Sequence, residues 1–456
     1  MGKTTKKQAV TPKKQAETPM MQQYWRYRRE VPQDALLLFR LGDFYEMFHA
    51  DAEEGARLLG ITLTQRSGYP MAGIPYHAAN TYLNKLLEAD KKVAIVDQVE
   101  TPRPGKLVKR ALTRILTPGT TLDEHQLDAR ANRYLLALTR EEADGKAFHA
   151  AWMDLSSGVF VMASAEDPDA LMAVFHAIAP TEVLLPEMEA CTWAHDEALH
   201  AWHADFDHFC ATRSVTHLPD DHFRRDAGAR AVMETLGVLN LDGFGIARAH
   251  PALGAAGALV AYVTETLQAP PANLASLQLY EPARTLRIDP ATQRNLEVFR
   301  SAAGTRAGSL LEAMDGTVTA AGARLVERWI AEPLLDLAAL RERQLTVGEF
   351  IDEPGAAAAV QALLKQCRDL ARILGRLQNR LRNPRELTAI RDTLAQLPPL
   401  RDELGACQGM RLLALRERID DLPALTAYLN RALNAEPPSK LEQGGVIAKG
   451  FDAELD

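Results

Sequence analysis

The chain has 456 residues, of which 47% are hydrophobic and 25% are charged, as in ordinary folded globular proteins. One hydrophobic core rarely serves so long a chain, so we expect roughly three or four domains. No apolar run is long enough to cross a bilayer, which argues against a membrane protein. The basic N-terminus lacks the apolar stretch of a secretory signal, so a cytoplasmic location is expected.

Basic residues are concentrated at the start of the chain, although the net charge is -8. Residues 1–135 carry 21 lysines and arginines against 15 aspartates and glutamates, whereas the remainder carries 31 against 45. This asymmetry suggests a surface for a polyanion in the first part. Alternatively, the five lysines among the first fourteen residues form a disordered tail that supplies most of the surplus.

The cysteines and histidines give no clear metal or disulfide signal. The four cysteines lie far apart without a CxxC pair: Cys191, Cys210, Cys367 and Cys407. Four histidines fall between the first two of them: His195, His200, His203 and His208. No two of these histidines have the spacing of the helical zinc motif, so a solvated loop region is favoured over a metal site.

The first 130 residues predict a flexible arm and then a small mixed α/β domain. Residues 1–18 are polar and lysine-rich, and Thr18-Pro19 suits a helix N-cap followed by proline at the first helical position. The pattern then predicts a strand at 35–39, a helix ending at Gly60, a strand at 61–66, a loop containing Gly68, Pro70, Gly73 and Pro75, a helix at 77–87, and strands at 92–99 and 112–116.

Residues 131–268 predict a second α/β domain, and residues 269–456 predict a mostly helical region. The expected elements of the second domain are strands at 134–138, 148–155, 159–162 and 182–185 and a helix at 168–178. Ala269-Pro270-Pro271 is a plausible linker. From Asn295 onward, leucine, alanine, arginine and glutamate recur at helical spacing between prolines.

Catalytic signatures are mostly missing. Gly2-Lys3-Thr4 resembles the end of a P-loop, but the required earlier glycine and strand are not there. Asp154 could ligate magnesium in a nuclease of ribonuclease-H-like fold. The adjoining predicted strands contribute no further carboxylate, so a capping or turn role for Asp154 is favoured.

The segment around Phe44 carries the strongest binding signal. In an extended strand Phe44 and Glu46 project to one side while Tyr45 points to the other. A turn at Gly42-Asp43 would place this pair on a protruding edge. The alternative is that Phe44 and Phe48 are core residues one helical turn apart.

A basic stretch supports nucleic-acid binding. Between residues 101 and 122 the basic residues are Arg103, Lys106, Lys109, Arg110 and Arg114, with no acidic residue before Asp123. Such a stretch suits a surface that contacts phosphates, and Arg66 at the end of its predicted strand could add to it. A solvated loop is the alternative for so short a run.

Five segments resemble bacterial MutS proteins in content and order. They are Thr18-Pro19-Met20-Met21-Gln22-Gln23-Tyr24, Gly42-Asp43-Phe44-Tyr45-Glu46, Met71-Ala72-Gly73-Ile74-Pro75-Tyr76-His77, Thr117-Pro118-Gly119-Thr120, and residues 289–297 with the sequence DPATQRNLE. The similarity runs from about residue 18 to the last residue, and five blocks in order are specific.

The resemblance implies a domain plan. We expect a mismatch-binding domain at 19–130, a connector domain of ribonuclease-H-like fold at 131–268, and the start of a helical core and lever domain at 269–456. It also implies a clamp and a dimerising ATPase that uses ATP and magnesium. Neither is found in this sequence, so a fragment or truncated product is expected, with no cofactor of its own.

The resemblance also assigns roles to the two residues at the edge. Phe44 would be the aromatic wedge at a mismatch in double-stranded DNA, and Glu46 would hydrogen-bond the displaced base. A carboxylate among phosphates is repelled, so Glu46 would either accept from a base N–H or be protonated and donate. Two alternatives stay open: a metal-dependent nuclease built on the connector, and a scaffold whose acidic connector recruits a MutL-like partner.

Overall fold

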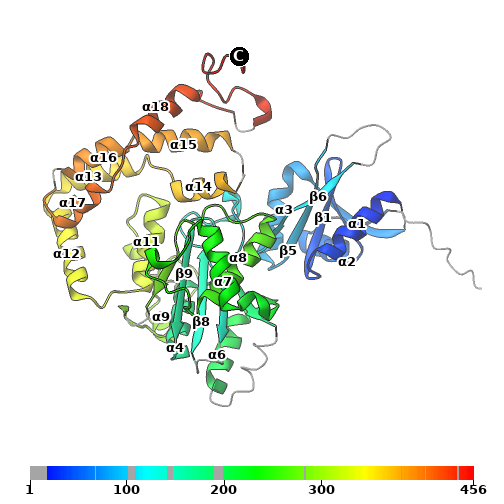
Figure 1. Cartoon of the computed structure of the whole chain (residues 1–456), viewed down its shortest axis with the longest axis horizontal. Coiled ribbons are helices and arrows are strands. Elements are labelled where there is room, and N and C mark those ends of the chain that lie inside the picture. Colours follow the sequence, from blue (N-terminus) through cyan, green and yellow to red (C-terminus); the bar gives the residue numbers. More distant parts are fainter. Residues whose placement is uncertain are drawn as a thin grey trace, which may run out of the picture. The chain divides into compact units, whose positions relative to one another are not determined.

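The computed structural model describes residues 18–66, 68–100, 108–140, 147–187, 199–281, 284–379, 381, 383–405, 407–438 and 441–456 (Figure 1). These residues form two compact units with the boundary after Leu116. Each unit is built on a six-stranded sheet. The multidomain α/β plus α architecture expected from the sequence is confirmed.

The first unit has strand order β3-β4-β2-β1-β5-β6, in which only β1 and β5 run parallel. Its elements are α1 (Pro19–Glu30), β1 (Ala35–Leu41), β2 (Phe44–Phe48), α2 (His49–Leu59), β3 (Thr64–Arg66), β4 (Tyr69–Pro75), η1 (Tyr76–Ala78), α3 (Ala79–Glu88), β5 (Lys92–Gln98) and β6 (Arg110–Leu116). The predicted N-cap is confirmed, because Thr18 Oγ1 accepts a hydrogen bond from the Met21 N–H at 3.3 Å.

Helices cover both faces of this sheet. Leu36 and Leu38 of β1 pack in the cluster that includes α2 and α3, whereas Leu37 and Phe39 pack with α1. A strand buried on both faces needs apolar residues at every position, which explains why β1 reads as a continuous apolar run rather than an alternating one.

The predicted loop from Gly68 to Pro75 is wrong, because Tyr69–Pro75 form β4. This strand pairs with β2 on one side and β3 on the other. Local glycine and proline preferences are outweighed by this pairing. Pro70 and Pro75 lie at the ends of β4, where a missing N–H costs the ladder least. The strand predicted at 61–66 is correspondingly short, Thr64–Arg66.

The second unit begins with a sheet of order β11-β10-β7-β8-β9-β12. β7, β8 and β9 form an antiparallel meander, and β10, β11 and β12 join in parallel pairs. The strands are β7 (Leu135–Arg140), β8 (Phe148–Asp154), β9 (Val159–Ala165), β10 (Glu182–Pro186), β11 (Ser214–Leu218) and β12 (Gln278–Tyr280). This order and these directions agree with the ribonuclease-H-like expectation. The sixth strand lies beyond the predicted linker at 269–271.

Two helix layers enclose this sheet. α4 (Pro168–Ile178) and α6 (His200–Cys210) pack on one face, and α7 (Arg225–Leu236) and α8 (Leu253–Leu267) pack on the other. α7 and α8 touch through backbone, since a Cβ added to Gly257 would lie 2.1 Å from the Gly228 Cα. Larger side chains at either glycine would force the helices apart.

A buried carboxylate fixes the start of the second unit. Glu182, at the start of β10, is fully buried. Its Oε2 accepts from Thr117 Oγ1 at 2.6 Å and from the Gly119 N–H at 3.0 Å. Its Oε1 accepts from Tyr262 Oη at 2.6 Å and from Thr216 Oγ1 at 2.9 Å. These bonds make the Thr117–Thr120 block an anchor for the sheet.

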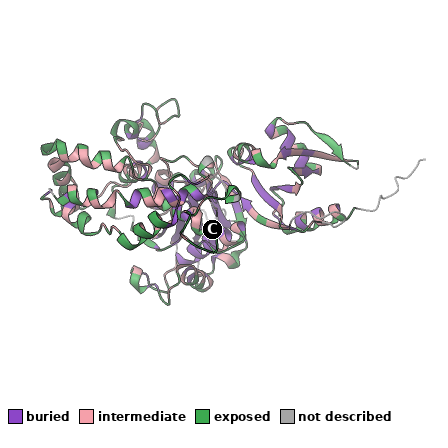
Figure 2. Ribbon diagram, turned by 90° about the horizontal axis from the view of Figure 1, so that it is seen from above, coloured by how far each residue is buried: buried purple, intermediate pink, exposed green. Residues whose placement is uncertain are grey.

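The C-terminal part is helical, as predicted. Its helices are α9 (Pro290–Asn295), α10 (Leu310–Met314), α11 (Ala320–Ala331), α12 (Leu337–Asp352), α13 (Pro354–Leu364), α14 (Leu370–Gln378), α15 (Pro384–Leu394), α16 (Leu397–Gly405), α17 (Met410–Glu417) and α18 (Pro423–Ala432). Figure 2 shows buried strands in both sheets and mostly exposed or half-buried residues in these helices. Within the described ranges, no helix combines the length and hydropathy needed to cross a membrane.

Candidate nucleic-acid interface

The turn before Phe44 places this residue at the end of a hairpin. Strands β1 and β2 are joined by Gly42-Asp43, with Leu41 paired to Phe44. Gly42 has φ of 58°, and glycine at the first position of a two-residue loop is typical of a type II′ turn. The carbonyl of Asp43 accepts from the Tyr76 N–H at 2.9 Å, which ties the turn to the end of β4.

Side chains along β2 alternate as predicted. Tyr45 and Met47 are buried in the cluster with α2, whereas Phe48 is buried in the cluster with α1. Phe44 and Glu46 share the face of Phe48 by strand alternation. Phe44 is 46% exposed, so the alternative that it is a core residue is wrong, although it holds for Phe48.

Glu46 forms an ion pair with Arg66 of β3. Arg66 Nη1 lies 2.7 Å from Oε2 and 2.9 Å from Oε1 of the glutamate. The glutamate side chain is 12% exposed, and the arginine side chain is 45% exposed. Arg66, predicted as a contact to the DNA backbone, is therefore bound to Glu46 in this structure.

Gly73 leaves room for both candidate residues. It pairs with Glu46 across β2 and β4. A Cβ built on Gly73 would lie 3.5 Å from Glu46 Cγ and 3.9 Å from Phe44 Cδ1. These are ordinary van der Waals distances, so a side chain at this position would pack directly against Glu46 and Phe44. The sequence prediction assigned Gly73 to a loop and missed this role, because only the strand register brings it opposite Glu46.

Arg40 and Tyr76 lie beside the hairpin, and neither was singled out from sequence. The Arg40 guanidinium carbon lies 3.5 Å from the centre of the Tyr76 ring, which is itself 45% exposed. Arg40 also lies 3.7 Å from Asp97, which accepts from the Tyr45 hydroxyl at 2.8 Å. Burial and the nearby carboxylate of Asp97 raise the pKa of Tyr45 to about 12, so its hydroxyl stays a donor.

Arg110 holds the sheet together rather than facing solvent. The residue is 8% exposed, and its guanidinium lies 4.9 Å from the centre of the Phe39 ring. Its Nε donates to the Arg40 carbonyl at 2.8 Å, and its Nη1 donates to Gln23 Oε1 at 2.9 Å. The expected contact of Arg110 with a phosphate is therefore not supported, because its donors are used inside the unit.

The other predicted basic residues differ in how exposed they are and in whether the structure describes them. Lys109 is exposed and immediately precedes β6. The register places the C-terminal end of β5 and the N-terminal end of β6 at the same end of the sheet as Phe44. Arg114 is half-buried further along β6. Arg103 and Lys106 lie outside the described residues. Lys109 is thus the described member of the basic stretch that best suits a phosphate contact.

Asp154 has the turn role that was favoured from the sequence. It is fully buried at the end of β8, and its Oδ1 accepts from the Ser156 N–H at 2.9 Å and from Ser156 Oγ at 2.6 Å. Its Oδ2 accepts from the Arg133 N–H at 3.4 Å. The carboxylate is engaged within the protein, so the nuclease alternative is not supported.

The histidine-rich segment shows no metal cluster where it is described. His203 Nδ1 lies 3.1 Å from an Asp207 carboxylate oxygen, whereas Cys191 and His195 lie outside the described residues. In the described part of the chain, no group of three or more histidines, cysteines or carboxylates is arranged to hold a metal ion.

Comparison with known proteins decides the family. Residues 18–125 match MutS domain I, residues 133–278 match MutS domain II, and residues 291–454 match MutS domain III. The chain belongs to the MutS family. Phe44, Glu46, Arg66 and Gly73 all lie within the match to MutS domain I.

Relatives in this family cover nearly all of the chain. The DNA mismatch repair protein MutS of Symbiobacterium thermophilum is 39% identical over 449 residues, which is 96% of this chain and 50% of the relative. The protein of the same name from Syntrophobacter fumaroxidans is 38% identical over 445 residues, which is 96% of this chain and 49% of the relative. The chain spans about half the length of these MutS proteins.

Proposed function

We propose that the first unit recognises mismatched or unpaired bases in double-stranded DNA, as the first step of DNA mismatch repair. Phe44 inserts at the defective step from the minor groove, and Glu46 contacts the displaced base. The MutS names of the relatives support this role. The single observation that best supports it is that the aromatic ring of Phe44 is 46% exposed beside the turn of the β1–β2 hairpin.

The physical basis of discrimination is the cost of unstacking. Wedging a side chain between base steps costs a few kcal/mol, and it costs least where pairing is already defective. A wedge therefore prefers mismatches through deformability and needs no reading of the surrounding sequence. The turn at Gly42-Asp43 and the pairing with β4 hold Phe44 in place, so little ordering is required on binding.

Glu46 contributes a hydrogen-bond acceptor whose charge is compensated. A lone carboxylate would be repelled by the phosphates, but the cation of Arg66 is already bound to it. Of the two possibilities raised by the sequence, this pairing favours Glu46 as an acceptor from a base N–H. Lys109 and, further along β6, Arg114 are proposed to contact the backbone, together with Arg103 and Lys106 of the segment outside the described residues.

The test compares affinity for two duplexes that differ by one mismatched or unpaired base. Fluorescence anisotropy gives the ratio of heteroduplex to homoduplex affinity for the wild-type chain and for Phe44→Ala, and the pair of proteins should also be compared in a longer MutS background. The ratio is expected to fall to about one in Phe44→Ala.

Leu239→Ala is the matched control, because Leu239 is an exposed apolar side chain of the second unit, 98% exposed. It should keep the wild-type ratio. Equal ratios for wild type and Phe44→Ala would remove the wedge assignment.

We also propose, for a protein that carries these domains, the further roles of the MutS family. ATP and magnesium would act in a separate ATPase domain, the protein would form a homodimer, and a MutL-like partner would bind the acidic second unit in the cytoplasm. The excess of 45 acidic over 31 basic residues after residue 135 supports a protein partner there. This contact is tested by pull-down with a MutL-like protein as bait, in which the full chain is compared with a variant that lacks residues 131–268.

A further inference from the structure

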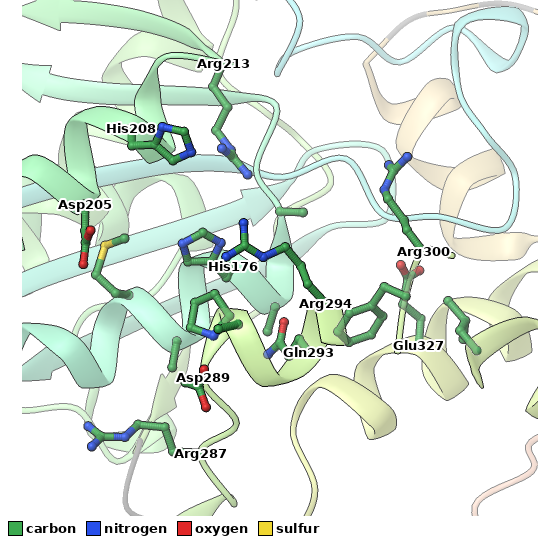
Figure 3. Close-up of a pocket in the computed structure, with 18 of the residues that line it drawn as sticks. His176, Asp205, His208, Arg213, Arg287, Asp289, Gln293, Arg294, Arg300 and Glu327 are labelled. Carbon is green, nitrogen blue, oxygen red and sulfur yellow. The ribbon is translucent and has the colours of Figure 1, made fainter. Parts of the chain in front are cut away.

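A pocket of about 860 Å³ opens in the second unit beside α4. Its lining comes from the segment before β7 with Asp128 and Ala131, from α4, from α6 and the segment that follows it, from the segment around α9, and from α10 and α11. Figure 3 shows the charged side chains of this lining, with His176, His208, Arg213 and Arg294 lying near one another. The volume is in the range of pockets that hold small organic ligands.

One end of this pocket brings together two guanidinium groups and an imidazole from three elements. His176 comes from α4, Arg213 follows α6, and Arg294 comes from α9. Figure 3 places the Arg294 guanidinium beside the His176 ring, with Arg213 above them. His208 of α6 lines the same end. Guanidinium groups with imidazole neighbours are suited to phosphate, because their planar donors match its oxygens.

Arg213 and Arg294 differ in how many of their hydrogen-bond donors already bind other groups of the protein. Arg213 Nε donates to the Pro180 carbonyl at 3.1 Å, and its Nη1 donates to the Phe209 carbonyl and to Thr212 Oγ1. Its guanidinium also lies 3.7 Å from the centre of the Phe209 ring, so most of its donors are already used. Arg294 is exposed, and across the described part of the chain no hydrogen bond or ion pair engages its side chain. Arg294 therefore presents a full set of donors to a ligand.

Electrostatics at His176 agree with an excess of positive charge. Burial, and then the nearby guanidinium groups of Arg213 and Arg294, lower the pKa of His176 to about 4, although Asp205 opposes this. Asp289 also lines the pocket, but its carboxylate caps α9 and accepts from the Thr292 N–H at 2.9 Å. Over the whole lining five arginines face five carboxylates, so the positive charge is confined to the end with Arg213 and Arg294, and a phosphate would bind there.

We propose that this pocket binds a small phosphorylated ligand, with the phosphate held between His176, Arg213 and Arg294. The rest of the ligand would lie toward Met172, Phe299 and Leu311, which give the lining apolar surface. The volume of about 860 Å³ suits a small molecule, and binding of a DNA duplex is the alternative that the test distinguishes. This site is separate from the proposed wedge in the first unit and does not depend on it.

Isothermal titration calorimetry of the 456-residue chain with AMP, inorganic phosphate and adenosine tests the proposal. AMP and phosphate should bind saturably, and adenosine should not. Arg294→Gln should weaken both by about tenfold, since it removes hydrogen bonds to a charged ligand without breaking an internal contact. Arg287→Gln is the matched control, because Arg287 lines the pocket but is already paired with Asp167 at 2.8 Å.

Proton NMR of the His176 ring, with the signal assigned by its loss in His176→Gln, shows whether the ligand binds in this pocket. It also distinguishes a small phosphorylated ligand from the phosphates of a DNA duplex. AMP should raise the pKa of His176, because a nearby anion favours the protonated ring. A short DNA duplex should leave it unchanged. The proposal is overturned if AMP and phosphate fail to bind, if Arg294→Gln and Arg287→Gln weaken AMP equally, or if only the duplex shifts the His176 signal.

Discussion

Arg66 and Glu46 form an ion pair in which Nη1 of the arginine lies 2.7 Å and 2.9 Å from the two carboxylate oxygens. The pair connects β3 to β2, with β4 between them. Arg66 was expected to contact phosphate and Glu46 to contact a base. The pairing means that their effects on DNA binding are coupled, and that a change in one alters the charge that the other presents.

Substitutions at this pair should therefore not be additive. Glu46→Gln is expected to weaken mismatch discrimination while leaving much of the general DNA affinity. Arg66→Gln should lower general affinity, because the charge of Glu46 is then uncompensated near phosphates. In the double variant the two effects should couple by about 0.5–1 kcal/mol, the range for partly exposed pairs.

Anisotropy titrations of the four proteins of this cycle, on matched heteroduplex and homoduplex at one salt concentration, measure the coupling. Additive effects would show that Arg66 and Glu46 act independently on DNA.

Lys109 and Arg110 are neighbours in sequence, but alanine substitutions at the two positions should affect different properties. Lys109→Ala should reduce DNA affinity and the dependence of affinity on salt, with thermal stability unchanged, since its side chain is exposed. Arg110→Ala should destabilise the first unit by roughly 1–3 kcal/mol, because the Arg40 carbonyl and Gln23 lose a buried donor. Urea unfolding and salt-dependent DNA titrations of both variants distinguish the two roles. A loss of DNA affinity without destabilisation in Arg110→Ala would contradict this assignment.

Glu182 is expected to be essential to the second unit. Glu182→Gln places an amide where Thr117, Gly119, Thr216 and Tyr262 all donate. Unfolding of the second unit in urea should become easier by about 3 kcal/mol, since bonds to a charged acceptor are lost and an amide donor faces other donors. Glu265→Gln on α8 is the control, because Glu265 is exposed. Equal stability of the two variants would show that the network contributes little.

The ion pair of Arg130 and Asp315 predicts a pH dependence. Burial alone would raise the pKa of Asp315, but hydrogen bonds from Arg130, at 2.6 Å, and from Thr317 outweigh it and hold the pKa at about 2. The folded-state pKa is below the unfolded value of about 4. The stabilisation is therefore present above about pH 4 and is lost as the pH falls toward about 2.

Arg130→Gln should accordingly destabilise the second unit near neutral pH, and the difference from wild type should shrink as the pH falls from about 4. Urea unfolding at several pH values measures it. The exposed pair of Arg284 and Glu281 supplies the control, Arg284→Gln, for which little effect is expected at any pH. A difference for Arg130→Gln that does not change with pH would contradict the role of Asp315.

Much of the architecture was determined by sequence alone. Local patterns predicted β1 and β5 as strands and Thr18-Pro19 as the start of α1. The alternation of side chains in an extended strand predicted that Phe44 and Glu46 share a face. These predictions succeed because the patterns depend on residues close in the chain. The five ordered blocks identified the family for the same reason. The turn role favoured for Asp154 followed from the absence of further carboxylates on the adjoining predicted strands.

Only the tertiary structure decided the partners of individual side chains. β4 forms from a segment rich in glycine and proline because β2 and β3 pair with both of its edges, and pairing between distant segments has no local signal. The same register brings Gly73 opposite Glu46 and Arg66 within reach of it. Arg110 and Lys109 look alike in sequence, yet one is buried and the other is exposed, since burial is set by what packs on each side of β6.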